Sequence, residues 1–108
     1  MKQIDANQVE EQLKDNQKLT IIDVREPVEL TTGKIPGAIN IPLNLLEFRM
    51  HELNRATDYI IVCRSGARSG LATQLLQSHG FEVTNMTGGM MAWEAAVEQE
   101  STIQHTSN

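Results

Sequence analysis

The sequence predicts one α/β domain in which a parallel sheet is covered by helices on both faces. Short apolar runs alternate with helical patterns along the chain. The runs lie too far apart for tight hairpins, so crossover connections and parallel pairing are expected. A length of 108 residues suits one compact domain. We therefore expect a single domain over residues 1–98 and a polar, disordered tail over residues 99–108.

The first predicted elements are a helix over residues 6–15 and a strand over residues 19–24. Asp5 and Gln8 are spaced as a capping box, in which two side chains satisfy free backbone N–H groups at a helix start. The strand is predicted from an apolar, β-branched run that Pro27 follows closely. The chain therefore opens with a helix that leads into a buried strand.

The middle of the chain predicts a turn, a short strand and a second helix. Two glycines and a proline over residues 33–37 indicate the turn, and the strand-like residues 38–41 follow it. Apolar residues at roughly helical spacing then predict a helix over residues 43–53. This segment adds one strand and one covering helix to the domain.

The last third of the chain repeats the alternation. A clear apolar strand over residues 59–62 leads through a short loop, 63–68, into a helix over residues 69–79. Another strand over residues 81–86 and a last helix over residues 90–98 complete the domain. The loop 63–68 thus lies where a strand runs into a helix.

Composition excludes several classes of function. Fourteen acidic and nine basic residues give a formal charge of −5, which argues against nucleic-acid binding because that affinity depends on many phosphate contacts. The longest apolar run, residues 59–63, is far shorter than the ~18 residues that suggest a membrane span, and the first residues show no signal-like stretch. We expect a soluble, cytoplasmic protein that does not bind membranes.

Cys63 is the single cysteine of the chain. An internal disulfide, a CxxC redox pair and a cysteine zinc cage are therefore excluded. The three histidines lack metal-ligand spacing, so we expect no metal site. Any chemistry of this thiol proceeds without an internal partner.

The candidate functional site is the loop after the strand over residues 59–62, because ligands of open parallel sheets bind beyond the strand ends. It comprises Cys63, Arg64, Ser65, Gly66, Ala67 and Arg68. Gly66 permits a tight path, so backbone N–H groups can converge on the sulfur. Such surroundings lower the ordinary thiol pKa of about 8.5 to roughly 3.5–7.5. Because a helix end contributes only ~0.3–1 kcal/mol, we expect Arg64 and Arg68 to help.

Two other interpretations of this loop remain open. Cys63 alone is typical of an inert, buried thiol, and a lone arginine is usually a solvated surface charge. The combination favours a site, since two arginines flank a glycine directly before a helix and no acidic residue occurs between Asp58 and Glu82. We therefore expect a locally positive pocket that attracts a small anion.

Four separated motifs occur in order along the chain. They are residues 21–27 (IIDVREP), 33–42 (GKIPGAINIP), 63–69 (CRSGARS), and Gly88-Gly89 with Trp93. With these motifs the chain resembles the rhodanese homology domain in its single-domain form, over residues 4–93. The resemblance implies a three-layer α/β/α domain with a central five-stranded parallel sheet, whose fifth strand lies near residues 2–4. It also implies a persulfide sulfur carried on Cys63.

The length of the cysteine loop separates two related activities. Related folds include phosphatases with a longer loop and an arginine six positions after the cysteine. Here the sixth position is Ser69, and the arginine comes one residue earlier, at Arg68. The smaller ring of N–H groups favours sulfur transfer over a phosphatase or arsenate reductase. The chain departs from the family at Lys34, where histidine is common, and we interpret that position as structural or peripheral.

The resemblance implies a sulfurtransferase that moves a sulfane sulfur from thiosulfate or a similar donor to a thiophilic acceptor. Cys63 is the expected nucleophile, Arg64 and Arg68 are expected to hold the donor oxygens, and the N–H groups of residues 64–68 to stabilise the persulfide. No cofactor is expected, and the acceptor is expected to be cyanide, a small thiol or a thioredoxin-like protein. The alternative is a non-enzymatic persulfide carrier or interaction module that delivers sulfur to a partner. The sequence leaves open the physiological donor, acceptor, pathway and oligomeric state.

Residues near the loop also carry predictions. We expect Asp23 and Arg25 to form a structural ion pair or loop anchor, because charges at strand ends usually organise the connection. The alternative is that they face the site. Glu29 and Lys34 are predicted to be solvated, with a place at the entrance of the site as the alternative. Ser69 is predicted to cap the following helix rather than contact substrate.

The segment before the last predicted helix is interpreted as packing. Met90, Met91 and Trp93 are predicted to be packing residues, with a role for Met90 in lining the pocket as the alternative. The pair Gly88-Gly89 is predicted to allow close backbone approach.

Overall fold

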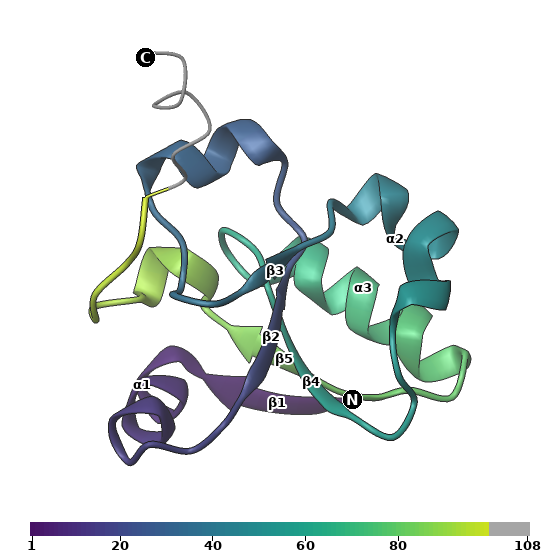
Figure 1. The fold of residues 1–108 in the computed structure, drawn as a ribbon, viewed down its shortest axis with the longest axis horizontal. Coiled ribbons are helices and arrows are strands. Elements are labelled where there is room, and N and C mark those ends of the chain that lie inside the picture. The colour runs from purple at the N-terminus through teal and green to yellow at the C-terminus, as the bar shows by residue number, and fades with distance from the viewer. Residues whose placement is uncertain (100–108) are drawn as a thin grey trace, which may run out of the picture.

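The fold is a five-stranded, all-parallel sheet within residues 1–99, which are the residues that the computed structural model describes (Figure 1). The strands are β1 (Lys2–Asp5), β2 (Thr20–Asp23), β3 (Ile39–Asn40), β4 (Asp58–Val62) and β5 (Glu82–Thr87). Their order across the sheet is β1-β5-β4-β2-β3, so β4 is central. The expected fifth strand near residues 2–4 is confirmed as β1. The tail predicted over residues 99–108 lies outside the described residues from residue 100 onward.

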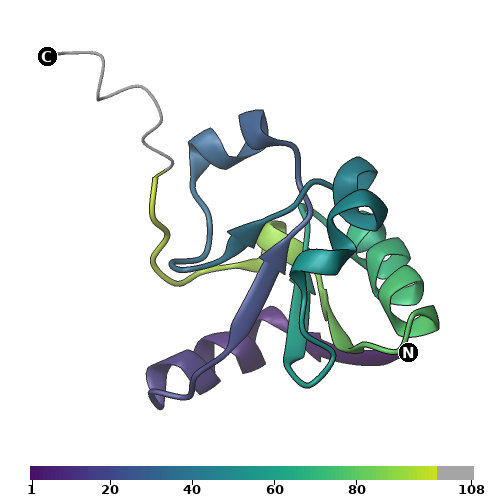
Figure 2. The same ribbon diagram turned by 45° about the vertical axis from the view of Figure 1, so that its right-hand side comes forward.

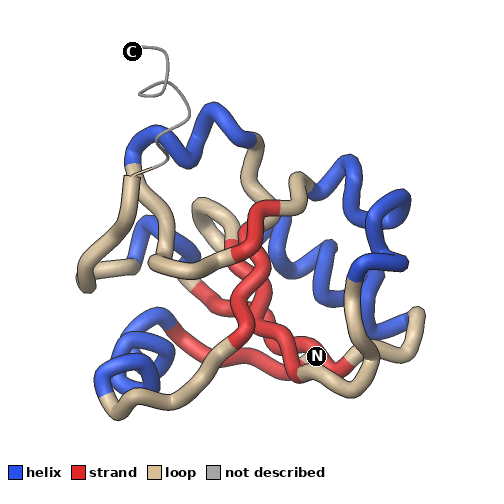
Figure 3. The backbone as a smooth tube through the Cα atoms, viewed as in Figure 1, coloured by secondary structure: helices blue, strands red, loops and turns tan. Residues whose placement is uncertain are grey.

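Helices cover both faces of the sheet, as Figures 1 and 2 show from two sides and Figure 3 shows by colour. They are α1 (Ala6–Lys14), α2 (Leu43–Arg49) and α3 (Ala67–Ser78), with short 3₁₀ helices η1 (Pro27–Thr32), η2 (Met50–Glu52) and η3 (Gly89–Ala92). One apolar cluster joins α2 and α3 to one face, and a second joins α1 to the other. The predicted three-layer α/β/α architecture is confirmed.

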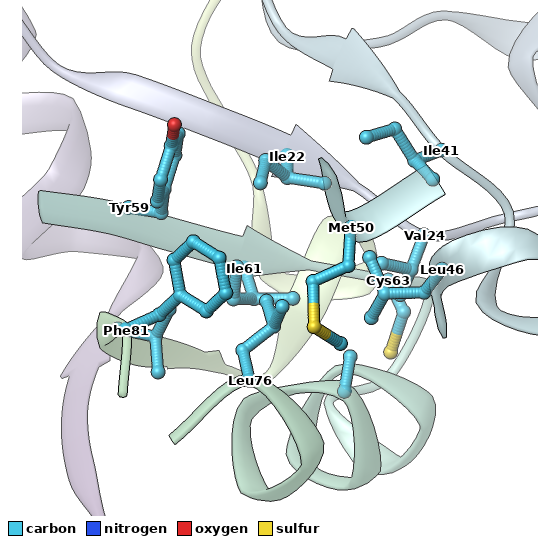
Figure 4. Close-up of a cluster of buried hydrophobic side chains, with 12 residues drawn as sticks. Ile22, Val24, Ile41, Leu46, Met50, Tyr59, Ile61, Cys63, Leu76 and Phe81 are labelled. Atoms are coloured by element: carbon cyan, nitrogen blue, oxygen red, sulfur yellow. The ribbon is translucent and has the colours of Figure 1, made fainter. Parts of the chain in front are cut away.

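The central strand alternates between the two clusters. Ile60 and Val62 belong to the cluster on the α1 side, whereas Ile61 and Cys63 belong to the cluster on the α3 side. Because both faces are covered, the strand reads as a continuous apolar run. The same alternation directs the Cys63 side chain toward the helix that carries Leu76, as Figure 4 shows.

Two predicted helices differ from the observed elements. The helix predicted over 43–53 is α2 followed by the 3₁₀ turn η2, because the backbone at Arg49 leaves helical geometry (φ −100°, ψ 7°). The helix predicted over 90–98 is wrong: only η3 forms. The backbone N–H groups of Glu94 and Ala95 donate to the Glu10 carboxylate at 2.6 and 3.1 Å, which takes them out of helical bonding.

Two further elements differ from prediction. Helix α3 begins at Ala67, two residues earlier than predicted, and η1 was not predicted at all. Both segments flank the cysteine loop, so the differences matter for the site.

No helix among residues 1–99 is long and apolar enough to cross a membrane.

Candidate active site

The cysteine loop lies at the carboxyl end of the central strand. Cys63 directly follows β4, and Gly66 precedes the first residue of α3. Gly66 adopts a left-handed conformation (φ +105°), which glycine reaches without the steric cost of a Cβ atom. A Cβ atom added there would also lie 3.3 Å from the backbone nitrogen of Gly88. The loop therefore turns in a very small space, and this turn aims backbone N–H groups at the cysteine.

The Cys63 sulfur is buried and surrounded by hydrogen-bonding groups. The Gly66 N–H donates to Sγ at 3.0 Å, and Ser69 Oγ lies 3.3 Å from Sγ. Burial raises the pKa of the thiol, but hydrogen bonds from the Ser69 hydroxyl and from the backbone N–H groups of Ser69, Gly66 and Ser65 together lower it below its ordinary value. The site thus favours the thiolate, which is the nucleophilic form.

The end of β5 and the segment after it hold the loop from the other side. The N–H groups of Met90 and Met91 donate to the carbonyl oxygens of Cys63 and Arg64, each at 2.9 Å. Asn85 Nδ2 donates to the Gly66 carbonyl at 3.3 Å. A Cβ atom on Gly89 would collide with the Arg64 carbonyl, so the predicted close backbone approach at this glycine pair is confirmed. The loop is therefore clamped by η3 as well as tethered to α3.

The two loop arginines differ in their partners. Arg64 is exposed, and within residues 1–99 its guanidinium has no hydrogen-bond or ion-pair partner. Arg68 forms a two-pronged pair with Glu29, with Nη1 to Oε2 at 2.7 Å and Nη2 to Oε1 at 2.8 Å. The hydrogen bonds from Arg68 lower the pKa of Glu29 to about 2. The carboxylate is therefore ionised throughout the neutral range.

A cleft of about 330 Å³ opens beside the loop. Its lining residues are Arg25, Glu29, Thr32, Arg64, Met90 and Met91. Cys63 has no exposed surface, so a donor in the cleft reaches the sulfur only when a covering group moves. The cleft combines an exposed cation, a carboxylate and apolar methionine side chains beside the end of β4.

Comparison with known proteins identifies the family. The Rhodanese-like domain family model matches residues 5–96. The Sulfurtransferase of Allochromatium vinosum is 38% identical over 92 residues, which are 84% of this chain and 86% of that protein. The Thiosulfate sulfurtransferase GlpE of Pseudoalteromonas translucida is 37% identical over 91 residues, which are 82% of this chain and 86% of that protein. This chain belongs to the rhodanese-like family.

A solved structure agrees with the family assignment. The crystal structure of a rhodanese-like domain protein from Staphylococcus aureus has a TM-score of 0.88 and 32% sequence identity, covering 94% of this chain and 100% of that one. The similarity therefore includes the arrangement of sheet and helices, and extends over nearly the whole chain.

The structure places the predicted loop residues in three different settings. Cys63 is buried, Arg64, Ser65 and Ala67 are exposed, and Gly66 and Arg68 are half-buried. Ser65 contributes its backbone N–H to the sulfur, and Ala67 begins α3. The loop thus keeps its donors inside and leaves two short side chains and one arginine facing outward.

Two predictions about neighbouring residues have opposite outcomes. The Asp23–Arg25 ion pair is confirmed: Arg25 Nη2 donates to Asp23 Oδ2 at 2.8 Å, with both side chains buried. The prediction that Ser69 caps α3 is wrong, because Gly66 occupies the N-cap position. Ser69 is fully buried and faces the sulfur instead. The sequence signal for this contact is the position of Ser69, six residues after Cys63.

Three further residues correct or extend the sequence interpretation of this rhodanese-like domain. Glu29 is not a solvated charge, since it pairs with Arg68 and lines the cleft. Lys34 is also not solvated: its Nζ donates to the Ala38 carbonyl at 2.9 Å, and it pairs with Glu98 at 3.5 Å. Its interpretation as structural therefore agrees with its contacts. Met90 lines the cleft, which was the alternative to simple packing.

No metal centre is found in the described part of the chain. Within residues 1–99, no group of three or more His, Cys, Asp or Glu side chains is arranged to hold a metal ion. The chemistry that the described residues offer is that of one activated thiol beside a cleft with one exposed guanidinium.

Proposed function

We propose that this rhodanese-like domain is a sulfurtransferase in which Cys63 receives the sulfane sulfur of thiosulfate or a similar donor and passes it to a thiophilic acceptor. The observation that carries the proposal is the 3.0 Å hydrogen bond from the Gly66 N–H to the Cys63 sulfur, inside a loop whose other donors lower the thiol pKa. The names of the two relatives, a sulfurtransferase and a thiosulfate sulfurtransferase, support the same chemistry.

The first half-reaction loads the enzyme. The Cys63 thiolate attacks the outer sulfur of thiosulfate, a new S–S bond forms, and the bond between the two thiosulfate sulfurs breaks. The electron pair of that bond leaves with sulfite, so no separate oxidant or reductant is needed. The exposed Arg64 holds the sulfonate oxygens by charge-assisted hydrogen bonds, with Arg68 joining once it is released from Glu29.

The persulfide then resides in the loop. Its terminal sulfur carries the negative charge, and the backbone N–H groups of residues 64–68 stabilise that charge, as the N–H groups of Ser65 and Gly66 stabilise the thiolate. The same tight loop argues against a phosphatase, because Ser69 occupies the sixth position and already contacts the sulfur. The Gly66 N–H points at the sulfur atom, which supports binding of a single sulfur rather than of a three-oxygen anion.

The second half-reaction unloads the enzyme. A nucleophilic acceptor attacks the outer sulfur, and the Cys63 thiolate leaves with the electron pair of the S–S bond. The chain has no second cysteine, so the acceptor comes from outside: cyanide in an assay, and a thiol or thioredoxin-like protein in a cell. We place this exchange in the cytoplasm, where free thiols stay reduced.

The test is the mass of the intact protein after exposure to thiosulfate, together with turnover of thiosulfate and cyanide. We expect wild type to gain the mass of one sulfur atom and to form thiocyanate with ping-pong kinetics. The Cys63→Ser variant should fold, gain no sulfur and show no turnover, whereas Ser65→Ala should load normally, since Ser65 contributes only its backbone N–H. Turnover by Cys63→Ser would refute the mechanism.

The same assay separates the enzyme from a carrier. Stoichiometric loading of Cys63 without turnover would identify a non-enzymatic persulfide carrier that delivers its sulfur to one protein partner. Hydrolysis of an aryl phosphate at a rate above that of sulfur transfer would replace the proposal by a phosphatase.

A further inference from the structure

Three arginines lie around the sulfur and its cleft, and two of them are already neutralised. Arg25 is paired with the buried Asp23 carboxylate, and Arg68 is paired with Glu29. Only Arg64 has an unengaged guanidinium among these three, within the described residues. The cationic character that the sequence suggests for the pocket is therefore largely cancelled in the folded protein.

The pair between Glu29 and Arg68 occupies the face of Arg68 that an anion would use. Both terminal nitrogens donate to the two carboxylate oxygens, which is the bidentate arrangement that also recognises planar or tetrahedral oxyanions. An incoming sulfonate must therefore displace the Glu29 carboxylate or bind without Arg68. Because Glu29 also lines the cleft, its negative charge faces the same anion.

Arg68 belongs to the same short loop as Cys63, five positions further along the chain, and its partner Glu29 lines the cleft. The hydrogen bonds with Glu29 raise the pKa of Arg68, so its guanidinium stays charged. The pair is also accessible to competition, since about a third of the Arg68 side chain and a quarter of the Glu29 side chain are exposed (35% and 27%). A partly exposed pair exchanges partners far more readily than a buried one.

We propose that Glu29 determines the charge selectivity of the site by competing with anionic donors for Arg68. The inference rests on the proposed function, because it specifies the donor class of the same site. Glu29 disfavours small, doubly charged donors such as thiosulfate, which still react through Arg64. It favours donors whose sulfane sulfur is carried on a group of low negative charge.

The experiment compares a neutral and an anionic reagent at the single cysteine. Rates of Cys63 alkylation by iodoacetamide and iodoacetate are measured at pH 7 in wild type and Glu29→Gln, and the ratio of iodoacetate to iodoacetamide rates is compared. The neutral reagent reports thiolate content and access, so the ratio isolates the effect of reagent charge. We expect the ratio to rise about tenfold in Glu29→Gln, which corresponds to ~1.4 kcal/mol.

A matched control is available in the chain. Arg49 and Glu52 form a second two-pronged pair, with nitrogen-to-oxygen distances of 2.9 and 3.0 Å, on the segment formed by α2 and η2. Glu52→Gln removes the same charge and the same kind of pair, and should leave the ratio unchanged. The double variant Glu29→Gln/Arg68→Gln should lose the gain, because no guanidinium is released.

An unchanged or lower ratio in Glu29→Gln, or an equal rise in Glu52→Gln, would overturn the inference. If Glu29→Gln does not fold, Glu29→Ala frees Arg68 equally and must raise the ratio. Alkylation requires no sulfur transfer, so the two proposals fail separately: absence of persulfide on Cys63 refutes the proposed function, and an unchanged ratio refutes the role of Glu29. Where sulfur loading occurs, Glu29→Gln should also lower the KM for thiosulfate.

Discussion

Two carboxylate–arginine pairs adjoin the same cleft, and they differ in burial and in backbone contacts. In the Asp23–Arg25 pair, both side chains are almost fully buried (1% and 4% exposed). Asp23 also accepts from the Arg25 N–H at 3.0 Å, and Arg25 Nη2 donates to the Gly33 carbonyl at 3.0 Å. The Glu29–Arg68 pair is partly exposed: Glu29 Oε2 also accepts from the Glu26 N–H at 2.9 Å, whereas among the described residues the Arg68 guanidinium contacts only the Glu29 carboxylate.

The difference separates an ion pair that fixes structure from one that can open. The first pair ties the end of β2 to the turn at Gly33, so its arginine is unavailable to a substrate although it lines the cleft. The second joins η1 to α3 by one pair of side chains, so Arg68 can change partners without unfolding a segment. Burial of the arginine and its backbone hydrogen bonds therefore determine which of the two arginines can change partners.

The largest expected effect is on stability, from Asp23→Asn. This change leaves the Arg25 guanidinium buried without a charged partner, which typically costs ~3–5 kcal/mol. By contrast, Glu29→Gln should cost no more than about 1 kcal/mol, because the partly exposed pair is screened by solvent. Urea unfolding followed by circular dichroism measures both values.

Equal losses in Asp23→Asn and Glu29→Gln would remove the distinction between the two pairs. Glu52→Gln provides a reference for loss of a surface pair, since two nitrogens of Arg49, Nε and Nη2, also donate to the two carboxylate oxygens of Glu52. The order expected for the loss of stability is Asp23→Asn first and the two glutamate variants well behind it.

The second prediction concerns the thiol pKa, which should depend on Ser69 rather than on the charge of Arg68. The Glu29 carboxylate neutralises the charge of Arg68. The hydrogen bonds from Ser69, Gly66 and Ser65 are therefore the groups that offset burial, which raises the pKa of the thiol. Ser69→Ala should therefore raise the pKa of Cys63, seen as a shift of the pH–rate profile of iodoacetamide alkylation to higher pH. Ser65→Ala is the matched control and should leave the profile in place, because its backbone N–H remains. A profile that Ser69→Ala leaves unmoved would show that the hydroxyl does not stabilise the thiolate.

The parts of this molecule that could be predicted from sequence are those whose physics is local or repeats along the chain. Strands buried on both faces give continuous apolar runs, so β4 and the position of Cys63 at its end followed directly. The Asp23–Arg25 pair was also predictable, because its members are two residues apart at a strand end. Gly66 carried its own signal, since only a glycine tolerates that turn beside a helix start.

The parts that could not be predicted depend on contacts between distant segments. Glu29 and Arg68 are 39 residues apart, and nothing local distinguishes Glu29 from a solvated acid. Likewise, the last predicted helix fails because Glu10 accepts the backbone N–H groups of Glu94 and Ala95, which are 84 and 85 residues away. Tertiary contacts decided both outcomes, and they changed the expected charge of the site more than its expected fold.

The smallest expected effect is the pH dependence of the Glu29–Arg68 pair. The hydrogen bonds from Arg68 lower the pKa of Glu29 to about 2, whereas an unfolded glutamate titrates near ~4.3. A carboxyl group with a lowered folded-state pKa stabilises the protein above its unfolded pKa, and this contribution disappears as the pH falls toward the folded value. The difference in free energy of unfolding between wild type and Glu29→Gln should therefore be constant above about pH 5 and smaller at pH ~3. Urea unfolding of both proteins at these pH values measures it. A difference that grows on acidification would mean that Glu29 is protonated more readily in the folded protein, and the pair could then not hold Arg68 against a donor.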